Sequence, residues 1–152
     1  MYEIISIFAF LKSTIMLQRI QSLFLFVAAG LLLSMFFTPM ITLMDGETIR
    51  YIERYDMLVF LIVTFVLSVT TFFSYKNRMF QIRLCVLNAL ILLGWQIFIL
   101  VLFLKREPVM IYSLTAVFPV VAAVLTFLAL RYISRDEAMI RAASRLRSSR
   151  RR

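Results

Sequence analysis

Residues 84–104 read LCVLNALILLGWQIFILVLFL, and this stretch decides the fold class. None of its side chains is charged, whereas Arg83 precedes it and Lys105 follows it directly. A bilayer hydrocarbon core about 30 Å thick needs about 20 residues of α-helix. The stretch therefore predicts a helix that crosses a membrane.

Three further runs of similar length also lack charged residues. They are Leu23–Ile41, Met57–Phe73, which Ser74 and Tyr75 extend by a turn, and Val109–Leu130. The chain is 62% hydrophobic, above the roughly 45–50% of soluble domains, and its charges cluster between the runs. We predict an all-α fold, an integral membrane four-helix bundle whose spans occupy residues 20–133.

Turn signals and prolines divide the runs. The short segment Lys105–Pro108 predicts that the third and fourth helices are antiparallel neighbours, and Asp45-Gly46 predicts a turn in the first connection. Pro39 is interpreted as a helix terminator. Pro119 lies inside the fourth run, where the loss of a backbone hydrogen bond predicts a kink.

The distribution of Lys and Arg predicts the orientation. The N-terminal segment 1–19 contains two Lys or Arg residues, and the second connection contains three. The tail from residue 134, together with Arg131 before it, contains eight, so that thirteen positive residues lie on one side. The first and third connections together contain only four. Positive residues are retained in the cytoplasm, so we predict that both termini are cytoplasmic.

Residues 1–15 are largely apolar but too short to span a membrane. They are interpreted either as an interfacial helix or as a segment before the true start at Met16, and we favour the second interpretation.

The tail, residues 134–152, has the pattern of a basic amphipathic helix. Ser134 and Glu137 fit a capping box, and an apolar stripe follows at helical spacing. The stripe consists of Met139, Ala142, Ala143 and Leu146. The tail Arg residues are explained by attraction to anionic lipids or by an acidic protein partner, and nucleic acid is the least favoured partner.

Asn88 and Gln96 are the most polar side chains within the runs. They are candidates for substrate contact, but hydrogen bonds between helices are the favoured interpretation because no ionisable group lies at that depth.

Small residues at four-residue spacing suggest close helix packing. Gly30 with Ser34 and Cys85 with Ala89 form such pairs, and the fourth run has a small face of Ala122, Ala123, Thr126 and Ala129. Packing within one chain is favoured, with a homo-oligomer as the alternative.

Catalytic chemistry finds little support in the composition. The chain has no His and a single Cys, and no carboxylate lies within a run. These absences argue against a metal site of the usual ligands and against a Ser-His nucleophile. We expect no enzyme activity and no cofactor.

Two segments resemble a known family. Met16-Leu17-Gln18-Arg19-Ile20-Gln21 before the first run, and the closing stretch Arg131–Arg147, resemble the domain of unknown function 4293 family. The resemblance implies a small four-span inner-membrane protein of Bacteroidota with no assigned activity, and it supports Met16 as the start. In this family an acidic residue precedes the Arg145-Leu146-Arg147 group, where this chain has Ser144.

The resemblance also implies a distinctive surface at the cytoplasmic face. Its residues are Gln18, Arg19, Gln21, Asp136, Glu137, Arg141, Arg145 and Arg147. The leading hypothesis is a non-enzymatic scaffold or accessory subunit that binds a partner or anionic lipid through this face. The alternative is a small oligomeric transporter or channel for a neutral or lipophilic substrate.

Overall fold

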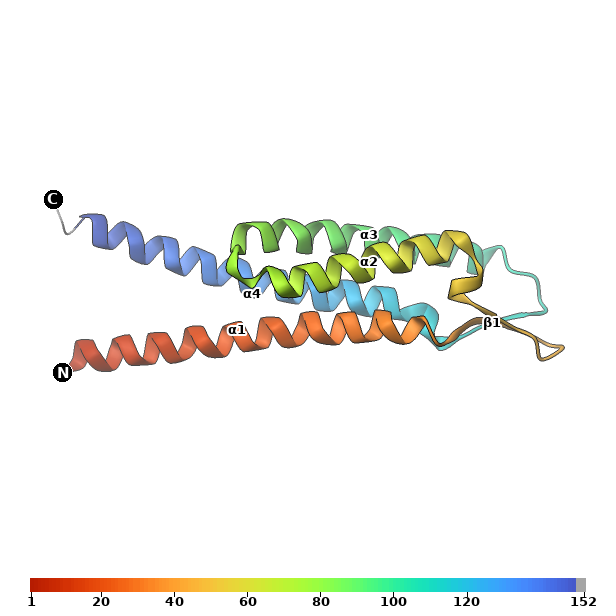
Figure 1. Ribbon diagram of the computed structural model, residues 1–152, viewed down its shortest axis with the longest axis horizontal. Coiled ribbons are helices and arrows are strands. Elements are labelled where there is room, and N and C mark those ends of the chain that lie inside the picture. The colour runs from red at the N-terminus through yellow and green to blue at the C-terminus, as the bar shows by residue number, and fades with distance from the viewer. Residues whose placement is uncertain (150–152) are drawn as a thin grey trace.

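The computed structural model describes residues 1–149, without the side chains of residues 10, 11, 13–15, 17, 18 and 147–149. The described residues form four long helices and three short strands (Figure 1). The helices are α1 (Tyr2–Met35), α2 (Tyr55–Phe73), α3 (Arg78–Leu104) and α4 (Phe118–Ser149), and the strands are β1 (Pro39–Leu43), β2 (Thr48–Arg50) and β3 (Met110–Tyr112). The predicted helical class is confirmed, and a small sheet is added to it.

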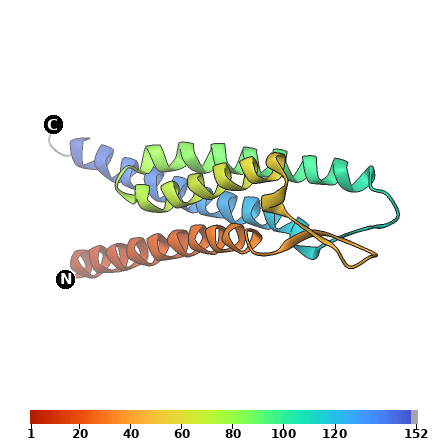
Figure 2. The ribbon, with the colours of Figure 1, turned by 45° about the vertical axis from the view of Figure 1, so that its right-hand side comes forward.

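The four helices lie along one axis as a bundle. Helices α1 and α3 each contact both α2 and α4. Helix α1 begins and α4 ends at the same end of the bundle, which we call the terminal end, and the strands lie at the opposite, sheet end (Figures 1 and 2). At the terminal end, α1 and α4 extend beyond the turn between α2 and α3 and diverge from each other (Figure 1).

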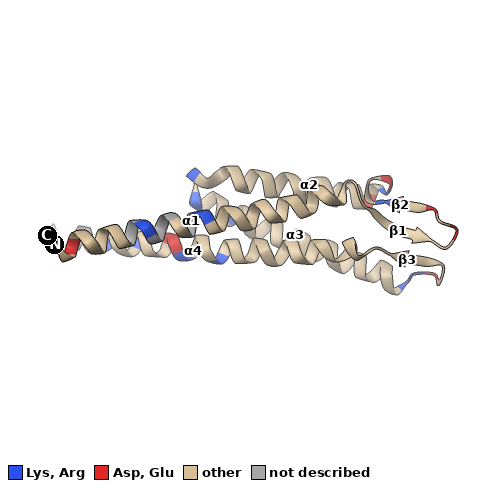
Figure 3. Cartoon of the chain, turned by 90° about the horizontal axis from the view of Figure 1, so that it is seen from below, with Lys and Arg blue, Asp and Glu red and all other residues tan. Residues whose placement is uncertain are grey.

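Three helices are long and apolar enough to cross a membrane, judged by length and composition. These segments are Tyr55–Lys76, Arg78–Leu104 and Leu114–Leu146, and α1 contributes a shorter apolar stretch, Arg19–Met35. Large apolar side chains such as Phe26, Leu90 and Phe127 are more than half exposed on the outside of the bundle. Charged residues gather at both ends and leave the middle uncharged (Figure 3). These features are those of a membrane protein.

The sheet corrects the predicted ends of two runs. Strand β1 pairs antiparallel with both β2 and β3, and Ile41 lies opposite Tyr112. The first helix therefore does not extend to Ile41 but ends at Met35, because Pro39 lacks a backbone N–H and disfavours helical geometry in the residue before it. The predicted turn at Asp45-Gly46 is confirmed, with Gly46 at a φ of 88°.

The fourth helix also begins later than predicted. Residues from Val109 onward lead into β3 and a 3-10 helix, and α4 starts only at Phe118. Pro119 therefore lies in the first turn, where its missing N–H costs nothing, and the predicted kink is wrong. The connection after Lys105 is not a short turn, although α3 and α4 pack as the predicted neighbours.

The terminal end corrects two further expectations. Helix α4 continues past Ser134 to Ser149, so no separate tail helix begins there and the capping box at Ser134 does not form. A residue inside a continuing helix has no free N–H groups to cap. Residues 2–15 likewise continue α1 instead of forming a separate helix, and residues 150–152 lie outside the described residues.

The predicted small-residue packing is confirmed in part. Cys85 and Ala89 of α3 are buried within the chain, as is the small face of α4. Gly30 is different, because a Cβ placed on it would meet no atom of the described residues within 4 Å.

Aromatic packing dominates the core near the sheet end. The fully buried Trp95 stacks on Phe60 at 6.1 Å between ring centroids, and its indole N–H donates to the sulfur of Met57 at 3.2 Å. Tyr51 packs edge-on against Trp95. The sheet thus packs against this aromatic core.

Candidate functional site

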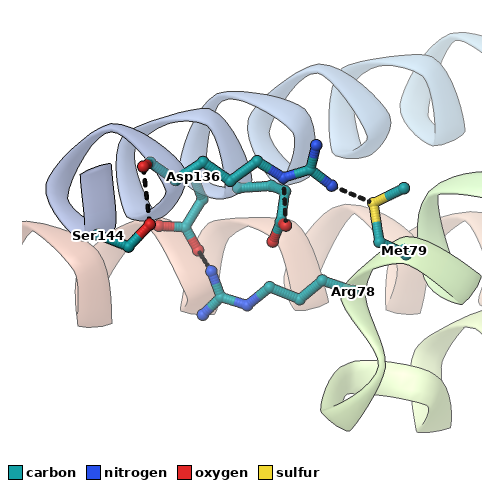
Figure 4. A network of polar contacts seen from close by, with 6 residues as sticks. Arg78, Met79, Asp136 and Ser144 are labelled. Atoms are coloured by element: carbon teal, nitrogen blue, oxygen red, sulfur yellow. Dashed lines mark hydrogen bonds and ion pairs between the residues drawn. The ribbon is translucent and has the colours of Figure 1, made fainter. Parts of the chain in front are cut away.

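An ion pair joins α3 to α4 at the terminal end of the bundle. The guanidinium of Arg78, the first residue of α3, donates to the carboxylate of Asp136 on α4 (Figure 4). Asp136 is only 2% exposed, whereas the Arg78 side chain keeps 26% of its surface. A buried carboxylate needs such a partner because desolvation disfavours an unpaired charge.

A second contact links the same two helices one turn further along α4. The side chain of Arg141 pairs with Glu137 at 3.0 Å and donates to the sulfur of Met79 on α3, also at 3.0 Å. The Met79 side chain points toward α4 in Figure 4. Because Arg141 remains 56% exposed, this contact contributes less to stability than the buried pair.

Polar side chains also line the interior beside Arg78. Gln81 donates to the carbonyl oxygen of Thr71 at 3.2 Å. Gln21 of α1 is 94% buried, and within the described part of the chain its amide nitrogen has no hydrogen-bond partner. A cavity of about 10 Å³ lies here, lined by Gln21, Ser22, Tyr75, Arg78 and Gln81. Its size and polar lining suit one water molecule.

A larger, open depression lies at the start of α3. Its volume is about 610 Å³, and its lining is Lys76, Asn77, Arg78, Met79, Phe80, Arg83 and Glu137. Three cations and one carboxylate surround it, so its lining carries a net charge of two positive units.

Only some of the residues predicted to form a surface at the terminal end are exposed there. Arg19, Arg141 and Arg145 are exposed and Glu137 is half-buried, whereas Gln21 and Asp136 point into the bundle. The side chains of Gln18 and Arg147 lie outside the described residues. Gln21 and Asp136 therefore belong to an interior polar cluster around Arg78, not to an exposed face.

The two amides within the spans each bond to another helix. Asn88 donates to the hydroxyl of Ser68 on α2 at 2.9 Å. Gln96 accepts from the backbone N–H of Val120 at 3.2 Å, in the first turn of α4, where the helix itself offers no acceptor. These are the interhelical hydrogen bonds that the sequence favours. Among the described residues, the Asn88 carbonyl oxygen has no partner.

Arg78, Lys76 and Arg83 were not predicted as site residues. Their sequence signal was present, since three cations lie within eight residues at the start of a helix, but it was used only to predict orientation. The partner of Arg78 lies 58 residues away in the chain, which no local pattern indicates. Among the described residues, no group of three His, Cys, Asp or Glu side chains is placed to hold a metal ion.

The family model described as Domain of unknown function (DUF4293) matches residues 17–146. The chain belongs to the DUF4293 family. This confirms the resemblance inferred from the sequence. No curated protein matches the chain, and no solved structure does.

The DUF4293 match covers both sides of the cluster. It includes Gln21 on α1, Arg78 on α3 and Asp136 on α4, and it ends at Leu146, the last residue of the apolar stripe. The interior cluster and the stripe therefore both lie within the family domain.

Proposed function

We propose that this DUF4293 protein spans the bacterial inner membrane four times, with both termini in the cytoplasm, and acts as a non-enzymatic scaffold or accessory subunit. The apolar stretch of α1, Arg19–Met35, is at the lower limit of about 17 residues for a span. Lys and Arg are concentrated at the terminal end, which supports a cytoplasmic position for that end.

The observation that carries the proposed role is the projecting end of α4. Its apolar stripe is exposed: Met139 is 39% and Leu146 73% exposed, and Ala142 and Ala143 are exposed as well. Charged residues on the same helix exclude it from the hydrocarbon core. An apolar stripe on a charged helix in water is the form in which helices dock into a groove of a partner protein.

The direction of α4 favours a protein partner over lipid for this stripe. From Asp136 to Ser149 the helix extends about 20 Å at about 1.5 Å per residue. Attraction to anionic lipids fades within a Debye length of about 8–10 Å. Arg131 and Arg135 therefore lie near enough to interact with lipid, whereas Leu146, at the far end of the stripe, lies about 15 Å beyond Asp136.

A point substitution tests the role more cleanly than truncation after Ser134, which would also remove the ion pair of Asp136. Leu146→Glu places a carboxylate on the stripe. Ser144→Glu places the same charge on the opposite side of the helix and is the matched control. The tagged proteins are purified in mild detergent at native expression, and co-purifying proteins are quantified by mass spectrometry.

A stoichiometric partner should be lost from Leu146→Glu and retained by Ser144→Glu. If both variants retain the same partners, or if the unaltered protein is recovered alone, the scaffold role is contradicted.

The alternative is a small oligomeric transporter or channel for a neutral or lipophilic substrate. The carbonyl oxygen of the buried Asn88, which has no hydrogen-bond partner among the described residues, is the observation in its favour. Under this alternative Asn88→Leu would abolish a transport or resistance phenotype, whereas under the scaffold role it would leave partner binding intact.

A further inference from the structure

We propose that the depression at the start of α3 binds the phosphate of an anionic phospholipid headgroup. This assignment rests on the proposed membrane insertion but not on the partner surface of α4. It concerns Lys76 and Arg83, which the proposed function leaves without a role.

The first step is the charge balance of the lining. Arg78 is neutralised by Asp136, and Glu137 is engaged by Arg141. The side chains of Lys76 and Arg83 have neither an ion pair nor a hydrogen bond to another described residue. Two uncompensated cations thus face one depression.

The second step is the local electrostatic field. The N-terminus of a helix carries a partial positive charge, so that cations there are unfavourable and anions favourable. Helix α3 has no acidic residue in its first turn, and the Asn77 side chain makes no capping hydrogen bond. The backbone therefore adds to the positive field of Lys76 and Arg83 instead of offsetting it.

The third step identifies the source of the phosphate. Phe80 and Met79 line the same depression and are 51% and 46% exposed. They lie in the first turn of α3, before its uncharged stretch begins at Leu84, so that a headgroup in the depression would extend its acyl chains along that stretch. A free phosphate ion would use the cations but not the apolar rim. The combination therefore fits a phospholipid.

The test uses the full chain in detergent, titrated with phosphatidylglycerol or phosphatidylcholine and followed by native mass spectrometry. Lys76→Gln with Arg83→Gln removes the two cations and leaves the pair of Arg78 and Asp136 intact. Lys12→Gln with Arg19→Gln is the matched control, because it removes two exposed cations from the same end. Size-exclusion chromatography verifies that both variants are folded.

The unaltered protein should bind phosphatidylglycerol in preference to phosphatidylcholine. Loss of both cations should weaken phosphatidylglycerol binding about thirty-fold, because each basic residue near anionic lipid raises the binding constant by a factor of about five. The control variant and Leu146→Glu should bind as the unaltered protein does, and millimolar inorganic phosphate should not displace the lipid.

If phosphatidylglycerol binding weakens equally in the Lys76/Arg83 variant and in the Lys12/Arg19 control, the lipid is attracted by the overall positive charge of this end and the proposed site is wrong. Displacement by inorganic phosphate would overturn the lipid assignment. Because Leu146→Glu tests the partner surface independently, failure of the scaffold role leaves this result unaffected.

Discussion

The carboxylate of Asp136 pairs with the guanidinium of Arg78, and this contact holds α4 to the start of α3 just before α4 projects from the bundle. Helix α1 contributes the buried Gln21 beside it. Beyond this buried ion pair, the exposed contact of Arg141 with Met79 is the next attachment of the projecting helix to α3.

Removal of one partner of this pair should destabilise the bundle. Breaking a buried pair costs about 3–5 kcal/mol, and because Arg78 keeps 26% of its surface we expect about 2 kcal/mol for Asp136→Asn. Replacing both partners, Arg78→Met with Asp136→Leu, should restore most of that loss. Unfolding in detergent measures each free energy, with Arg83→Met as the control. A double variant as unstable as the sum of the single variants would contradict a direct interaction.

Gln96 should act as a cap for α4. Gln96→Leu leaves the N–H of Val120 without its acceptor, and we expect a loss of about 1 kcal/mol in the free energy of unfolding. Hydrogen exchange at Val120 should become faster, while exchange in the middle of α4 stays unchanged. Ile97→Leu, at an exposed neighbouring position, is the control. Unchanged exchange at Val120 would rule out the capping role.

Tyr51 should make the sheet end sensitive to alkaline pH. Its hydroxyl lies 3.1 Å from that of Thr115, which in turn donates to the carbonyl oxygen of Pro39. Burial raises the pKa of Tyr51, although the hydrogen bond to Thr115 lowers it in part. The unfolded phenol ionises near pH 10, so stability is complete below about pH 10 and falls as the pH rises further.

Tyr51→Phe should reduce this fall, as measured by the melting temperature above and below about pH 10. Tyr55→Phe, which alters an exposed tyrosine, is the matched control and should leave the fall unchanged. The same pH dependence in all three proteins would show that another group is responsible.

Gly30→Ala should stabilise the monomer by about 0.5–1 kcal/mol, because alanine is the better helix former and the new Cβ meets no atom within 4 Å. Gly94→Ala, which also has open space, should behave in the same way. Sedimentation in detergent tests the homo-oligomer alternative: a smaller assembly in Gly30→Ala alone would show that Gly30 packs against a second copy.

The central parts of the helices could be predicted because length and the absence of charge suffice to recognise them. Their ends could not. Residues such as Ile41 and Tyr112 belong to uncharged runs, and only pairing across about 70 residues of chain makes them strands. The start predicted at Ser134 failed for the opposite reason, since a local capping pattern yields to a helix that is already formed.

The candidate site was predictable in composition but not in arrangement. Asp136 was identified as distinctive, yet its burial depends on Arg78, and the positions of both depend on how α3 and α4 pack. Gln96 was expected to bond between helices, but its acceptance of a backbone N–H depends on where α4 begins. Tertiary contacts, not local patterns, decide these roles.

The position of β1 between β2 and β3 has a mechanical consequence. Each of the two helical hairpins, α1 with α2 and α3 with α4, is joined at its connection to the same strand, so the hairpins cannot separate at the sheet end without breaking the ladder. At the other end the helices α1 and α4 diverge (Figure 2). The sheet and the α2–α3 connection thus tie the two hairpins together at opposite ends of the bundle, and the ends of α1 and α4 extend beyond the second of these ties.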